Sequence, residues 1–146
     1  MININKTNFN NIFNEPPHYN FHDSRIHNIN IDYKNDICRI ELLEFGKQNA
    51  TTLVLKNCVY HEIPKFKPWS KNNCDEISCI FGEYLNDFVD YIKEKRYFSF
   101  DKECFRLIEN QKLDNHFLII IEVFSGDYLK FIVTDLDIFD SSIEML

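Results

Sequence analysis

Glycine is scarce in this chain of 146 residues, which contains only Gly46, Gly82 and Gly126. They lie far apart, so no glycine-rich loop of the kind that cradles phosphate groups can be built from them. Long apolar runs are also missing, since none approaches the roughly 18 residues that a membrane-spanning helix needs. The asparagine-rich start, residues 1–14, lacks the apolar segment of a secretory signal. We therefore expect a cytoplasmic protein without a phosphate-binding loop and with no part in a membrane.

Cysteine usage excludes a complete intramolecular disulfide framework. The five cysteines are an odd number scattered over most of the chain (Cys38, Cys58, Cys74, Cys79 and Cys104), which fits a reducing compartment. Cys74 and Cys79 lack the second compact pair that structural zinc sites use. We therefore expect no metal and no cofactor, and we expect the cysteines on strands to be small core residues.

The charge balance is acidic. Sixteen basic and 23 acidic residues give a formal net charge of -7. A negative surface disfavours contact with nucleic-acid phosphates and attracts a basic protein. We expect no nucleic-acid partner.

Alternating apolar and polar residues predict strands rather than helices. We expect one α+β domain over residues 1–146, with residues 1–18 loosely ordered. Its core is a mainly antiparallel, twisted sheet of about six strands, curved or partly closed, with one principal helix over about Glu83 to Lys95. A short helix is expected around Phe9 to Phe13. The expected strands cover residues 25–33, 37–45, 51–63, 77–81, 97–109, 116–124 and 128–137.

Two of these expectations concern which faces of a strand are covered and which are exposed to solvent. The run Phe117 to Ile121 is apolar at every position, which predicts a central strand covered on both faces. The acidic C-terminal stretch instead alternates apolar residues with acidic ones (Asp135, Asp137, Asp140 and Glu144). That alternation favours an edge strand with a solvated outer face over a carboxylate metal site.

Four residues are candidates for binding. His22 and Asp23 place an imidazole beside a carboxylate just before a strand, which suits acid–base chemistry or metal ligation, although the position favours an Asp23 that accepts backbone N–H bonds and shapes the turn there. Trp69 lies in a lysine- and proline-rich loop and can either serve as a binding anchor or fold back over the sheet. Tyr60 is a second candidate aromatic anchor.

The order of these features resembles a known group. An opening Phe21-His22-Asp23, a strand pair, Pro68-Trp69-Ser70 and a terminal hairpin with Ser125-Gly126-Asp127 follow one another over residues 19–137. The chain resembles small bacterial proteins that begin with a hydrophobic-His-Asp signature, some of them grouped with immunity proteins of polymorphic toxin systems. The resemblance implies a role in protein binding and carries no catalytic residue across.

Three functions are compatible with the sequence. The leading hypothesis is a non-enzymatic cytosolic protein-binding domain, such as an immunity protein whose acidic surface meets a basic toxin domain. The second is a small metal-dependent or acid–base hydrolase centred on His22 and Asp23, with His61 as a third member. The third is a homo-oligomeric scaffold, for example a homodimer.

Overall fold

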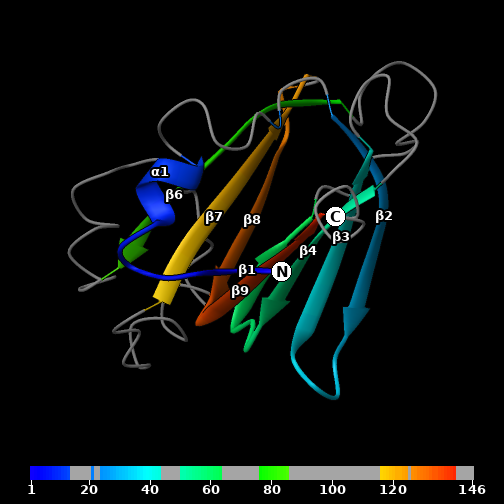
Figure 1. The fold of residues 1–146 in the computed structure, drawn as a ribbon. Coiled ribbons are helices and arrows are strands. Elements are labelled where there is room, and N and C mark those ends of the chain that lie inside the picture. Colours follow the sequence, from blue (N-terminus) through cyan, green and yellow to red (C-terminus); the bar gives the residue numbers. More distant parts are fainter. Residues whose placement is uncertain are drawn as a thin grey trace, which may run out of the picture.

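The structure is a computed structural model that describes residues 1–13, 21, 24–43, 50–63, 76–85, 116–124 and 126–140, and only the backbone of residues 83–85 and 140. These residues form nine strands and one short helix (Figure 1). The helix α1 spans Phe9–Phe13, and the strands are β1 (Ile2–Ile4), β2 (Arg25–Asp32), β3 (Ile37–Leu43), β4 (Ala50–Lys56), β5 (Tyr60–Glu62), β6 (Ile77–Leu85), β7 (His116–Val123), β8 (Tyr128–Val133) and β9 (Asp135–Asp140).

The strands form two antiparallel sheets. Sheet A has the order β1-β9-β4-β3-β2, and sheet B has the order β5-β8-β7-β6. Figure 1 shows β7 and β8 running together on one side of the molecule and the β2–β3 hairpin on the other. The expected mainly antiparallel architecture is confirmed, whereas the nine strands in two sheets differ from the single sheet of about six.

Two connections join the sheets and lie next to each other: the bend at residues 57–59 between β4 and β5, and Thr134 between β8 and β9. The backbone N–H of Thr134 donates to the carbonyl oxygen of Lys56 at this crossing. The Asn57 side chain donates to the Thr134 hydroxyl over 2.9 Å, and Val59 N–H donates to Ile132. Asn57 adopts a φ of 52°, a left-handed conformation that asparagine tolerates better than most residues. This bend splits the strand expected over residues 51–63 into β4 and β5.

The β2–β3 hairpin forms as predicted, and one carboxylate holds its turn. Asp32 accepts hydrogen bonds from the backbone N–H groups of Lys34 and Asn35 and from the Asn35 side chain. The turn closes at Asp36, whose φ is 54° and whose carbonyl oxygen accepts the N–H of Cys58 from the bend. The turn is therefore attached to the crossing between the sheets.

The β7–β8 hairpin is also confirmed. Gly126 has a φ of 90°, and its N–H donates to Val123, which in turn donates to the carbonyl oxygen of Asp127. β7 pairs with β6 on one side and β8 on the other, and Phe117 to Ile121 are all buried. The prediction of a central strand covered on both faces is correct.

An aromatic cluster joins the helix to sheet B. The Phe9 ring stacks on Phe117 with centroids 5.0 Å apart and contacts Phe13 at 5.2 Å. Phe13 stacks in turn on Phe21 at 6.1 Å. Because all four side chains are buried, the short predicted helix Phe9–Phe13 is held by tertiary packing rather than by its own length.

Three expected features differ from the structure or lie outside its described residues. The predicted helix over Glu83 to Lys95 is wrong at its start, because residues 83–85 pair with β7 as part of β6. Its remainder, and the strand expected over residues 97–109, lie outside the described residues. β9 is not an edge strand either, because β1 covers one of its sides and β4 the other.

Candidate functional site

Of the four binding candidates, only Tyr60 lies within the described residues. Its ring is half-buried on β5, and its hydroxyl donates to Glu62 over 2.6 Å. Glu62 also lies 3.9 Å from the ammonium group of Lys130. His22, Asp23 and Trp69 fall outside the described residues, so their roles stay predictions.

The two residues that flank His22 and Asp23 are fixed in the structure. Ser24 N–H donates to the carbonyl oxygen of Phe21, and its own carbonyl oxygen accepts the N–H of Ile77 over 2.7 Å. Both Phe21 and Ser24 are buried, and within the part of the chain that the structure describes the Ser24 hydroxyl has no hydrogen-bond partner. The ends of this segment are therefore anchored between α1 and β6.

A pocket opens where the β2–β3 turn meets the bend between the sheets. Its volume is about 170 Å³. It is bounded by side chains from the hairpin and from the bend: Ile31, Asp32, Tyr33, Asp36, Ile37, Cys38, Cys58, Val59 and His61. The hydrogen bond from Cys58 to Asp36 holds the two halves of this pocket together.

The rim of the pocket is aromatic and exposed. Tyr33 is 75% exposed and Val59 is 44% exposed, although both are large hydrophobic side chains. The rings of Tyr33 and His61 lie 5.9 Å apart and are tilted by 57°. Exposed aromatic side chains beside a pocket are typical of binding surfaces.

The floor of the pocket contains two thiols. Burial raises the pKa of Cys38 to about 12 and that of Cys58 to about 11. Cys58 also donates a hydrogen bond from its Sγ to the carbonyl oxygen of Tyr60. Both groups are therefore protonated near neutral pH and do not supply the thiolate that nucleophilic catalysis needs.

Among the described residues that line the pocket, Asp32 and Asp36 are the only carboxylates, and none is a lysine or an arginine. Hydrogen bonds from the Asn35 side chain and backbone hold the pKa of Asp32 below its usual 3.8. Asp36 is exposed at the end of the turn. The pocket therefore favours a cation over an anion.

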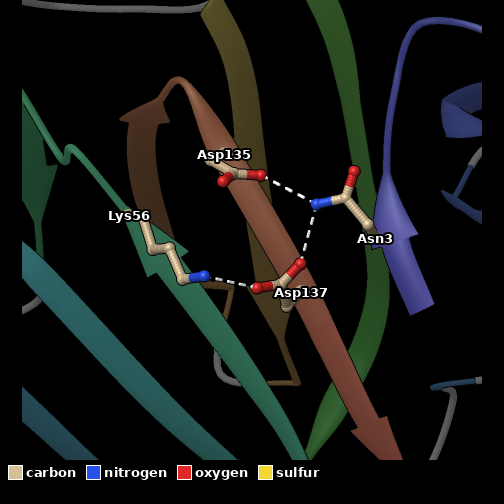
Figure 2. Close-up of polar contacts among 4 residues, drawn as sticks. All are labelled: Asn3, Lys56, Asp135 and Asp137. Atoms are coloured by element: carbon tan, nitrogen blue, oxygen red, sulfur yellow. Dashed lines mark hydrogen bonds and ion pairs between the residues drawn. The ribbon is translucent and has the colours of Figure 1, made fainter. Parts of the chain in front are cut away.

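A separate polar cluster lies where β1, β9 and β4 meet (Figure 2). Asp137 is only 2% exposed and accepts hydrogen bonds from Lys56 Nζ over 2.6 Å and from the Asn3 side chain over 2.7 Å. The Asn3 side chain also donates to Asp135. Asp137 was expected on a solvated face, and it is buried because neighbouring strands cover it on both sides.

This cluster predicts an acid-sensitive contribution to stability. Burial alone would raise the pKa of Asp137, but the hydrogen bonds from Lys56 and Asn3 outweigh it and hold the pKa below 3.8. A carboxylate with a lowered pKa stabilises the fold above the pKa of the unfolded chain and loses that contribution as the pH falls through its folded pKa. We therefore expect Lys56→Met to lower the urea midpoint at neutral pH.

The difference between Lys56→Met and the unmodified protein is expected to shrink between neutral pH and an acidic pH below the folded pKa of Asp137, because the protonated carboxyl no longer pairs with Lys56. Urea unfolding followed by circular dichroism at both pH values measures it. Lys34→Met makes the same chemical change at an exposed turn residue and should leave both midpoints unchanged. An equal loss for Lys56→Met at both pH values would contradict the ion pair.

The part of the chain that the structure describes contains no group of three or more histidine, cysteine, aspartate or glutamate side chains able to hold a metal ion. Within the same residues, no helix has the length and apolar character to span a bilayer. His61, the third member of the hypothetical hydrolase, lies in the pocket beside Tyr33.

Sequence reasoning missed Tyr33, Val59 and Asp36 as site residues. Alternation placed Tyr33 on the same face as Ile29 and Ile31, and only its position next to the turn signal Lys34-Asn35-Asp36 pointed to exposure.

Comparison with models of known protein families, with curated proteins and with solved structures gave no match.

Proposed function

We propose that the protein is a non-enzymatic, cytosolic binding domain for a basic protein, such as a toxin domain that it neutralises. The observation that carries this proposal is the exposure of Tyr33 and Val59 around a pocket with two carboxylates. Exposed tyrosines often form the few contacts that dominate the binding free energy between proteins.

The size of the pocket also favours binding over turnover of a small molecule. Small-molecule sites usually measure about 300–1,000 Å³, whereas this pocket measures about 170 Å³. The protonated thiols of Cys38 and Cys58 add no nucleophile. A surface that receives one side chain of a larger partner fits these dimensions better than an active site does.

The net charge of -7 supports a basic partner. Opposite net charges speed the encounter of two proteins, and salt weakens that effect because it screens exposed charges over about 8 Å at physiological ionic strength. Binding is therefore expected to weaken as the salt concentration rises.

Affinity capture followed by reconstitution tests this function. The tagged protein is used to capture partners from host lysate at about 50 mM and about 300 mM salt. Any retained protein is then purified, and its complex is measured by size-exclusion chromatography with light scattering. We expect a basic protein, retained best at low salt, that forms a complex of fixed stoichiometry.

If the partner is a toxin domain, co-expression should also restore growth to cells that produce it. Tyr33→Ala is expected to weaken the complex about tenfold or more. Tyr128→Ala removes another exposed tyrosine, from β8, and serves as the matched control. No retained protein at either salt concentration, or equal effects of the two variants, would contradict the proposal.

A further inference from the structure

We infer that the pocket between the β2–β3 turn and the bend receives a single arginine side chain of the partner. This inference rests on the proposed function and deepens it, because it names the chemical group that the site recognises. It depends on the size, the walls and the charge of the pocket.

The size fits one side chain. A protein cavity of about 150 Å³ holds a molecule of benzene, and the volume here is about 170 Å³. The pocket can therefore accept a side chain that is inserted from outside, whereas a folded segment or a nucleotide is too large for it.

The lining residues fit a side chain with a long aliphatic part and a planar charged group at its end. Ile31, Ile37 and Val59 provide apolar surface along which methylene groups can pack. Tyr33 and His61 supply the aromatic faces, and their tilt of 57° prevents them from closing on each other in a parallel stack. A guanidinium group stacks on such faces as well as interacting with them through its charge.

The negative charge of the lining carboxylates favours a cation, and the position of Asp36 favours a planar cation. The Asp32 carboxylate is already engaged by Lys34 and Asn35, which fix it in the turn. The Asp36 carboxylate is exposed, and its backbone is held by the hydrogen bond from Cys58. A guanidinium group can bind such a carboxylate through two parallel hydrogen bonds, which an ammonium group cannot do.

Titration with blocked arginine (acetyl-arginine methylamide) tests the inference on the free protein. Binding is followed by NMR shifts of the Tyr33 and His61 rings and of the Ile31 and Val59 methyl groups. Blocked citrulline has nearly the same shape without the charge, and blocked lysine has the charge without the plane. We expect saturable shifts at these residues with arginine, weaker ones with lysine and none with citrulline.

Asp36→Asn removes the charge alone, because asparagine also tolerates the left-handed φ of 54° at this position. It should weaken arginine binding about threefold or more. Glu41→Gln removes the same charge from β3 outside the pocket lining and should leave binding unchanged. Equal shifts with citrulline, shifts at other residues only, or equal effects of the two variants would overturn the inference.

The outcomes separate this inference from the proposed function. Capture of a basic protein together with no arginine response at the pocket would overturn the inference and leave the proposed function standing. An arginine response at the pocket without any captured protein would support the inference about the pocket and contradict the proposed function.

Discussion

Replacing Gly82 by alanine is expected to lower the free energy of unfolding by about 3 kcal/mol, near the upper end for overpacking a core. Gly82 lies in β6 opposite Ile119, and a Cβ built there would overlap the carbonyl oxygen of Leu118 on β7. It would also lie 3.0 Å from Cζ of Phe9. A side chain could rotate away, but a backbone oxygen within a paired sheet has little freedom to move.

Urea unfolding of the two glycine variants measures this effect. Gly126→Ala is the matched control, because Gly126 has a φ of 90° and open space around it. Its substitution is therefore expected to cost only the conformational penalty of about 1–2 kcal/mol. If Gly82→Ala were no more destabilising than Gly126→Ala, the close approach of β6 and β7 would not exist as described.

Phe9→Ala is expected to destabilise the protein by about 3–5 kcal/mol, the range for truncating a buried phenylalanine. Phe9 is 1% exposed and stacks on Phe117 with an angle of 2° between the rings. Its removal leaves a cavity between α1 and sheet B and breaks the contact with Phe13. The five-residue helix has too few hydrogen bonds of its own to persist without this packing.

Thermal and urea unfolding, followed by circular dichroism, test the second expectation. Phe124→Ala removes the same side chain at a position that is 50% exposed, and it should cost less than about 1 kcal/mol. Similar losses for the two phenylalanine variants would show that Phe9 is not the packing centre between the helix and the sheet.

Local signals in the sequence predicted the hairpins well. The alternation in residues 25–33, followed by a turn rich in asparagine and aspartate, gave β2 and β3 because both signals act over a few residues. The apolar run Phe117 to Ile121 gave the central strand for the same reason. Strand order was harder, because β9 pairs with β1 and β4, which are distant in the sequence.

The candidate site was only partly predictable. Tyr60, the predicted aromatic anchor, is half-buried on β5, and its neighbour His61 lines the pocket. Tyr33 shares the alternation of Ile29 and Ile31, but it is 75% exposed because it lies beyond the last residue of β2. Exposure at the end of a strand depends on which segments meet there, and that information is not local.

The pairing of β1 with β9 also bears on synthesis of the chain at the ribosome. Asn3 and Asp137, which this pairing brings together, are 134 residues apart in the sequence. At about 5–20 residues per second, translation leaves β1 without its partner for roughly 7–27 seconds. β4 also lacks its β9 partner on one side, for a shorter time because it is synthesised later than β1. Unpaired strand edges promote aggregation, so the nascent chain is expected to need chaperones most during this interval.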